Sequence, residues 1–299
     1  MILEYTIGLE DVGQPVRNIL KSRLQLSTNL VKKLKYQGNI YINNTPVRVN
    51  YIVNMKDKLK VELELDEECE NIEPQNIPID IIHEDDCLLV LNKQPGIVVH
   101  PTFNHPDSTI ANGIVYHLLQ RGISKKVRPV SRLDRDTSGI IIFAKNQFAQ
   151  DMLIKQMQQK VFEKEYLGIV HGIPSSIKGT IDLPIDRKPE SIMLRHISDT
   201  GAPSITHYEL LESFPKFNTA LLRFKLETGR THQIRVHCQA MGFPIYGDTL
   251  YSDSTDLLIS RQALHSHTTK IIHPGTQKEV IFNADLPNDI KHVLEIMRE

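Results

Sequence analysis

The chain has 299 residues, of which 40% are hydrophobic and 24% are charged, and its formal net charge at pH 7 is −1. This composition is typical of a soluble globular protein, and it neither favours nor excludes a nucleic-acid partner. No apolar run approaches the length that spans a membrane, and the N-terminus lacks the segments of a signal peptide. We therefore expect a cytoplasmic protein with no membrane partner.

The chain has three cysteines, Cys69, Cys87 and Cys238. Their spacing is not that of a metal site, and their number is not the even number that a set of disulfides needs. A reducing, intracellular setting is the simplest interpretation.

Although the net charge is close to zero, the charged residues are distributed unevenly along the chain. Residues 1–61 hold ten Lys and Arg against four Asp and Glu, whereas residues 62–74 hold seven acids and no base. Residues 87–150 carry a second excess, with eight bases and three acids. Local excesses of this kind, and not the total, are what a polyanion meets.

Residues 13–62 are predicted to form a small α/β unit. Two helical patterns come first, and the second has Ser27 as a candidate cap and ends at Gly38. The segment 39–43 then alternates like a strand, and Asn43-Asn44 suits a tight turn.

This order of elements resembles an S-four-like RNA-binding domain, which we place at residues 1–62. The resemblance implies that Lys32, Lys33 and Lys35, on the exposed side of the second helix, contact RNA phosphates. An ordinary solvated lysine face is the alternative. Residues 63–78 are acidic and contain two prolines, so we expect a linker there, followed by a second domain at residues 79–299.

The second domain opens with a buried strand at residues 88–91 and a helix that ends near Gln120. Asp107 or Ser108 is the expected cap of that helix. Four bases then lead into the next loop, and they are Arg121, Lys125, Lys126 and Arg128. They suggest the floor of an electrostatic groove, although a solvated basic loop has the same pattern.

The loop at residues 128–139 carries two carboxylates, Asp134 and Asp136, among three arginines, and a continuous apolar run follows at residues 140–144. The run predicts a strand buried on both faces, which is a rigid mount for the loop. Carboxylates close to fixed cations stay ionised, so the loop is a candidate reaction centre. A salt-bridge network without chemistry is the alternative.

The segment Arg132-Leu133-Asp134-Arg135-Asp136-Thr137-Ser138-Gly139 resembles the signature of the RluA-type pseudouridine synthases, which usually have His where this chain has Ser131. Two later segments resemble further motifs of that family. Residues 164–172 place Tyr166 two positions after a lysine, and residues 228–237 contain Arg230 and a Gln-Ile-Arg triplet that ends in Arg235.

The resemblance implies an α+β pseudouridine synthase fold with a central mixed or antiparallel sheet. It also implies isomerisation of uridine in ribosomal RNA, with the large subunit favoured, or in transfer RNA. Asp134 is then the catalytic carboxylate, Arg235 pairs with it, and Tyr166 packs on the uracil ring. Arg132 fills the gap left by the flipped base, and Arg128, Arg135 and Arg230 contact RNA. We expect no cofactor, and a monomer whose partner is RNA.

Two other functions agree with parts of the sequence. Asp134 and Asp136 could be the carboxylate pair of a glycosidase-like hydrolase, but a general acid needs a raised pKa and arginines lower it. A non-catalytic RNA-binding module would not need Asp134, Tyr166 and Arg235 together. A metal site is not expected, because the spacings of His232, His237, His265 and His267 match no zinc signature.

Overall fold

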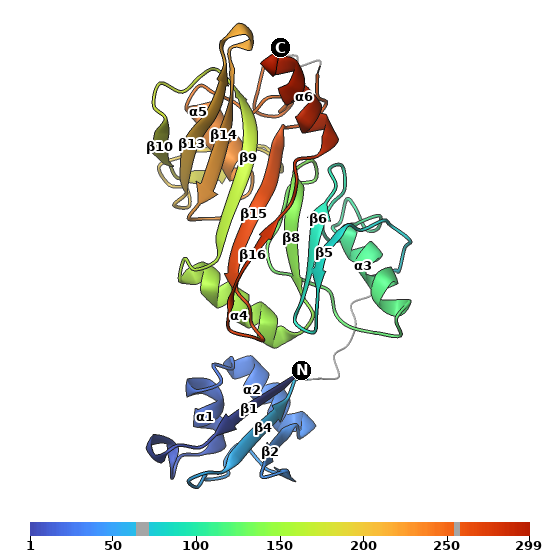
Figure 1. The fold of residues 1–299 in the computed structure, drawn as a ribbon, viewed down its shortest axis with the longest axis vertical. Helices are drawn as coiled ribbons and strands as arrows, with labels where there is room; N and C mark the ends of the chain where they lie inside the picture. Colours follow the sequence, from blue (N-terminus) through green and yellow to red (C-terminus); the bar gives the residue numbers. More distant parts are fainter. Residues whose placement is uncertain (64–71, 254–257) are drawn as a thin grey trace.

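The computed structural model describes residues 1–63, 72–253 and 258–299. Its first part is built on a four-stranded antiparallel sheet in the order β1-β4-β2-β3 (Figure 1). The strands are β1 (Ile2–Thr6), β2 (Ile40–Ile42), β3 (Thr45–Pro46) and β4 (Lys58–Glu62). A short 3-10 helix, η1 (Leu9–Asp11), and two α-helices, α1 (Val16–Ser22) and α2 (Thr28–Gln37), pack with this sheet in one apolar core.

Local signals in the sequence set the ends of α2. The hydroxyl of Ser27 accepts the Leu30 N–H at 3.2 Å, and Gly38 closes the helix in the left-handed region at φ 77°. Asn43 and Asn44 both have positive φ, as a tight β2–β3 turn requires. The predicted cap, helix end and turn are therefore confirmed.

The rest of the chain forms one large sheet, with the path β10-β13-β14-β9-β15-β8-β6-β5 and with β7 and β16 paired to β8 and β15. Its strands are β5 (Ile81–Glu84), β6 (Leu88–Lys93), β7 (Arg128–Pro129), β8 (Ser138–Ala144), β9 (Glu163–His171), β10 (Lys178–Asp182), β13 (Ile205–Phe214), β14 (Thr219–Leu226), β15 (Leu264–Ile272) and β16 (Glu279–Asn283). The β8–β15 pair is parallel and its neighbours are antiparallel, so the sheet is mixed, as predicted.

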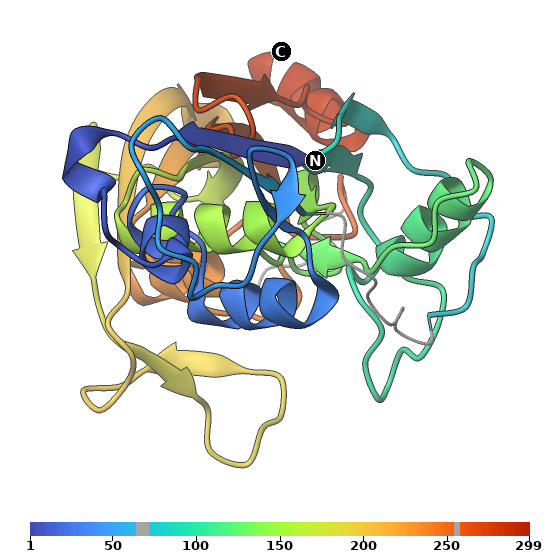
Figure 2. The same cartoon turned by 90° about the horizontal axis from the view of Figure 1, so that it is seen from below.

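In the described ranges, four α-helices and a hairpin accompany this sheet. The helices are α3 (Ile110–Leu119), α4 (Gln147–Gln158), α5 (Gln233–Ala240) and α6 (Asn288–Arg298), and η2 (Pro215–Phe217) is a short 3-10 turn. The hairpin of β11 (Ile185–Arg187) and β12 (Arg195–Ile197) projects from the body of the molecule (Figure 2). No helix in the described ranges is long and apolar enough to cross a membrane.

Helix α4 connects the two parts of the molecule (Figure 1). Its Phe148 and Met152 belong to the core of the N-terminal unit, whereas Ala149 and Leu153 belong to a core under the large sheet. Lys155 Nζ also donates to Gln25 Oε1 at 2.7 Å. The N-terminal unit is therefore packed onto the second part through a shared apolar contact.

Two predicted helix starts are wrong, and the backbone explains both. Ser108 has φ 56°, and the cap of α3 is Thr109, whose extended backbone allows a reciprocal capping box with Asn112. The residue type of Thr231 also predicts a cap for the helix after it, but α5 starts after His232, whose φ is 58°. In the predicted linker, residues 64–71 lie outside the described residues, while the Glu73 carbonyl accepts from Asn112 Nδ2 at 2.8 Å and so ties this segment to α3.

Gly139 is where β8 meets β15. Its φ is 106°, and a Cβ there would lie 2.2 Å from the Ser266 carbonyl oxygen and 2.7 Å from the Ser266 nitrogen. Only glycine adopts this conformation without strain and allows so close an approach of two backbones. All seven residues of β8 are buried, which confirms the predicted buried strand and makes Gly139 the fixed end of the preceding loop.

We expect Gly139→Ala to lower the free energy of unfolding by about 3 kcal/mol or more, because backbone strain and a clash with Ser266 add together. Chemical denaturation measures the loss. Gly122→Ala is the control: it has φ 70° and nothing within 4 Å of a Cβ, so only strain of about 1–2 kcal/mol applies. Equal losses in the two variants would contradict the close β8–β15 contact.

Candidate active site

A cavity of about 840 Å³ lies beside the loop that precedes β8. Its walls come from this loop, from β9, and from the segment between β14 and α5. Among its lining residues are Arg132, Asp134, Lys164, Tyr166, Arg230 and Arg235. The fold therefore brings together, in one cavity, three segments that are far apart in the sequence.

Arg235 lies between two carboxylates. Its Nε and Nη2 donate to the two oxygens of Asp248 at 2.6 and 2.8 Å, and its Nη1 donates to Asp134 Oδ2 at 3.1 Å. The side chain of Asp248 is 0% exposed and that of Arg235 is 5% exposed. Burial by itself would lower the pKa of Arg235, but Asp248 and Asp134 raise it above its usual value, so the guanidinium stays charged.

Asp248 has no place among the predicted site residues, although it fixes Arg235. Its Oδ1 also accepts the N–H groups of Leu250 and Tyr251, at 3.0 and 3.3 Å. The bidentate geometry sets the plane of the guanidinium, and the third nitrogen then faces Asp134. In the sequence, Gly247-Asp248 and Tyr251 follow soon after the segment 228–237, but nothing in that spacing shows that the Asp248 carboxylate pairs with Arg235.

Tyr166 is buried in β9 and lines the cavity. Burial raises the pKa of its phenol, so the group stays neutral. Because Tyr166 also belongs to the main apolar core, its ring has a fixed position against which a planar base can stack.

His232 is a second residue that the sequence reasoning did not assign to the site. Its Nε2 lies 3.8 Å from Asp134 Oδ2, and its Nδ1 is 2.8 Å from the hydroxyl of Tyr251. That hydroxyl accepts the Arg195 N–H of β12, and the Arg235 guanidinium lies 5.0 Å from the Tyr251 ring centroid. Burial lowers the pKa of His232, which favours the neutral ring.

Two buried basic side chains, Lys93 and Arg261, fix the backbone of the loop after Asp134. Lys93 Nζ donates to the carbonyls of Gln94, Ile97 and Arg135 at 2.9, 3.0 and 2.7 Å. Arg261 Nη1 donates to the Asp136 carbonyl at 3.0 Å, and the same guanidinium forms a bidentate pair with Asp289 of α6. The loop is thus attached to the β6 turn on one side and to the C-terminal helix on the other.

The other predicted contact residues fall into three groups. Arg132 is exposed, lines the cavity and donates to Thr231 Oγ1 at 3.0 Å, and Arg230 lines it as well. Arg128 is buried in β7 and donates to the Lys126 carbonyl, while Arg135 is exposed and pairs with Asp136 at 2.9 Å. Neither Arg128 nor Arg135 lines the cavity.

The third group is on the N-terminal unit. Lys32, Lys33 and Lys35 are all exposed on α2, away from its buried stripe of Leu30, Val31 and Leu34, and none of them lines the cavity.

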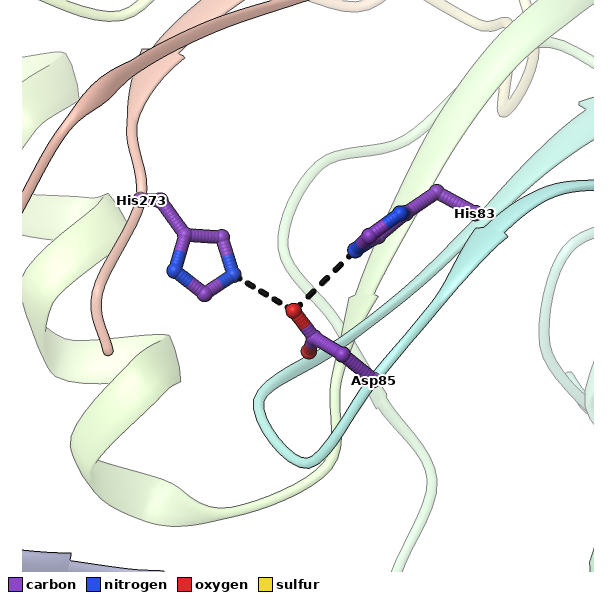
Figure 3. A group of neighbouring side chains, drawn as sticks. All are labelled: His83, Asp85 and His273. Atoms are coloured by element: carbon purple, nitrogen blue, oxygen red, sulfur yellow. Dashed lines mark hydrogen bonds and ion pairs between the residues drawn. The ribbon is translucent and has the colours of Figure 1, made fainter. Parts of the chain in front are cut away.

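Within the described ranges, one group of three side chains brings possible metal ligands together: His83, Asp85 and His273 (Figure 3). Asp85 Oδ2 lies 3.0 Å from His83 Nε2 and 2.7 Å from His273 Nε2. The Nδ1 of His273 accepts two backbone N–H groups, from Gly275 and Thr276, so its proton is on Nε2 and points to Asp85. A metal on that nitrogen would have to displace the proton, so the geometry favours a hydrogen-bonded clamp.

Comparison with known proteins identifies the class of enzyme. The profile of the family described as RNA pseudouridylate synthase matches residues 87–240. A human structure, RNA pseudouridylate synthase domain containing 4, shares the fold with a TM-score of 0.60 and 23% identity over 73% of this chain and 93% of that chain. The chain belongs to the RNA pseudouridylate synthase family.

Two relatives are similar over most of their length. YjbO of Bacillus subtilis (strain 168), described as an uncharacterized RNA pseudouridine synthase, is 39% identical over 91% of this chain and 95% of that protein. The ribosomal large subunit pseudouridine synthase D of Haemophilus ducreyi is 34% identical over 87% of this chain and 85% of that protein. The chain is therefore an RNA pseudouridine synthase, an isomerase, and the predicted RluA-type family is confirmed.

We expect Arg235→Leu to lower the free energy of unfolding by about 3–5 kcal/mol, because it leaves Asp248 buried without its cation. Activity should be lost as well, since Asp134 loses its partner. The double variant Arg235→Leu/Asp248→Leu removes the buried charge and should regain much of the stability but no activity. Thermal and denaturant unfolding measure both effects. If the free energy of unfolding of the double variant is no higher than that of Arg235→Leu, the loss in Arg235→Leu does not come from an unpaired Asp248 carboxylate.

Proposed function

We propose that this enzyme converts uridines in ribosomal RNA of the large subunit to pseudouridine, with Asp134 as its one catalytic carboxylate. Relatives of this chain that are named ribosomal large subunit pseudouridine synthase D support ribosomal RNA as the substrate, and transfer RNA is the alternative. The observation that carries the mechanism is the Asp134–Arg235 ion pair in the same cavity as the buried Tyr166. A monomer in the cytoplasm stays the prediction from the sequence.

The reaction breaks the bond between uracil N1 and ribose C1′ and forms a bond between C1′ and C5. The C5 proton leaves and N1 gains a proton, so neither a redox partner nor a group donor is needed. A uridine stacked in RNA must first be flipped out of the stack. Arg132 is exposed at the cavity edge, where it can take the place of the base, and Tyr166 can hold the flipped ring.

Asp134 then acts at the reacting atoms, either as a nucleophile on the ribose or on the ring, with the Arg235 guanidinium as its counter-ion. The positions of Asp134 and Arg235 agree with both routes. Asp136 is paired with Arg135 and does not line the cavity, which supports one catalytic carboxylate over the two that a glycosidase uses.

The N-terminal unit is proposed to bind RNA in the manner of an S-four-like domain. Residues 1–61 hold ten basic and four acidic side chains, and α2 presents three exposed lysines. Lysines that neutralise phosphates release counter-ions, so binding through them weakens as salt rises.

Asp134→Asn should keep the fold and RNA binding but form no pseudouridine, because an amide cannot act as nucleophile or take a proton. The assay is pseudouridine formation in transcribed large-subunit ribosomal RNA and, separately, in transfer RNA. Asp136→Asn is the matched control and should retain most of the activity. Turnover by Asp134→Asn at a near wild-type rate would refute the assignment, and an equally inactive Asp136→Asn would revive the two-carboxylate mechanism.

The RNA-binding role of the N-terminal unit is best tested with substitutions, because deleting it would expose Phe148 and Met152. We expect Lys32→Gln/Lys33→Gln/Lys35→Gln to reduce the slope of log affinity against log salt by about two units. A control that replaces the exposed Lys216, Lys278 and Lys291 removes the same charge elsewhere and should change the slope little. The hypothesis fails if the two triple variants have the same slope.

A further inference from the structure

Three lysines line the cavity, Lys160, Lys164 and Lys225, and among the described residues an acidic partner is found for Lys160 and Lys225 but not for Lys164. Lys164 lies two residues before Tyr166 on β9, so both side chains are on the same side of the strand. Its Nζ donates to Ser131 Oγ at 2.5 Å and lies 5.6 Å from the Phe162 ring centroid. In the part of the chain that the structure describes, we find no carboxylate paired with it.

The neighbouring charges are already paired. Glu163, adjacent on β9, pairs with Lys225, and Glu165 lies 3.7 Å from Arg223. Lys160, also in the cavity wall, pairs with Glu227 at 2.5 Å. These contacts engage the neighbouring carboxylates and leave Lys164 able to meet an anion that enters the cavity.

A structural role would require more partners than Lys164 has. Lys93 shows what such a role looks like, because its three ammonium protons have three carbonyl acceptors, those of Gln94, Ile97 and Arg135. Lys164 has one hydroxyl acceptor. Burial lowers the pKa of Lys93 to about 7 and that of Lys164 to about 8, so the two lysines differ in their acceptors and not in the direction of the pKa change. Lys164 is half-buried at the cavity wall, where its ammonium can meet a ligand.

We propose that Lys164 and Ser131 together bind a phosphodiester group of the RNA, next to the target uridine. Two protons on Lys164 Nζ stay available, and Ser131 Oγ, which accepts from Lys164, still has its own O–H to donate. Donors that converge on one place and carry a positive charge fit an anion with several acceptor oxygens.

The position of this pair relative to the other site residues limits which phosphate it contacts. Ser131 is three residues before Asp134 and Lys164 is two residues before Tyr166, and all four line one cavity. A nucleotide whose base contacts Tyr166 and whose ribose contacts Asp134 has its own phosphates within one bond or two of the sugar. The inference rests on the proposed function, and it names the phosphate on either side of the modified uridine as the ligand.

The test uses Lys164→Met and Ser131→Ala in the full-length enzyme, with RNA oligonucleotides that the wild type modifies. Binding is measured on an Asp134→Asn background, so that the RNA is not converted. We expect Lys164→Met to weaken binding about tenfold or more, and Ser131→Ala about threefold. Lys164→Arg should recover part of the loss.

Uncharged methylphosphonates, placed one at a time on the 5′ and 3′ sides of the target uridine, identify the contact. At one of the two positions, the methylphosphonate should weaken binding to the wild-type enzyme by the same factor as Lys164→Met does. The same methylphosphonate should not weaken binding to Lys164→Met any further, because that variant has already lost the contact. Independent, multiplying losses at both positions would overturn the proposal. Wild-type affinity of Lys164→Met would do so too.

Thermal unfolding separates this role from a structural one. Lys164→Met removes a half-buried charge whose one acceptor is a hydroxyl, so its melting temperature should equal or exceed that of the wild type. Lys93→Met is the control and should melt lower, since three carbonyls lose their donor. A lower melting temperature for Lys164→Met would contradict the proposal. If the wild-type enzyme modifies no RNA, the proposed function itself fails. If the wild-type enzyme modifies RNA but Lys164→Met binds RNA as tightly as the wild type, only the role of Lys164 fails.

Discussion

The active site depends on one guanidinium shared by two carboxylates. Arg235 is fixed by Asp248, which is fully buried and also accepts two backbone N–H groups, and its remaining nitrogen faces Asp134. A buried ion pair is tolerated when further hydrogen bonds satisfy its members, and here the Asp248 carboxylate accepts four, two from Arg235 and two from the backbone. Asp134 can therefore stay partly exposed, at 20%, while its counter-ion is held by the interior. The carboxylate that we propose reacts is accessible, and the guanidinium that orients it is buried.

The backbone of the loop that carries Asp134 is held by further contacts. Gly139 fixes the end of the loop against β15, and Lys93 and Arg261 bind the carbonyls of Arg135 and Asp136. Because Arg261 is paired with Asp289, the C-terminal helix takes part in positioning a loop more than a hundred residues earlier. Catalytic geometry built on a loop is usually less precise than geometry built on strands, and these attachments compensate for that.

The sequence predicted features whose cause is local. The buried strand β8, the Ser27 cap and the turn at Asn43-Asn44 each follow from neighbouring residues. The ion pair of Asp134 with Arg235 was predicted only from the family resemblance. The sequence analysis did not find Asp248, Lys93 and Arg261, because their contacts join segments that are distant in the sequence. Charge patterns also do not show which way a side chain points, so Arg128 and Arg135 could not be separated from Arg132, which lines the cavity.

Helix α4 packs against the N-terminal unit and also reaches the cavity. One side of the helix contributes Phe148 and Met152 to the N-terminal core, another contributes Ala149 and Leu153 to the core of the sheet, and Met157 near its end lines the cavity. A helix packed on two cores cannot rotate to suit one of them without disturbing the other. If the N-terminal unit binds RNA as we propose, that RNA would meet the cavity in a set orientation, and the unit would then affect which uridine is presented as well as how tightly the RNA is bound.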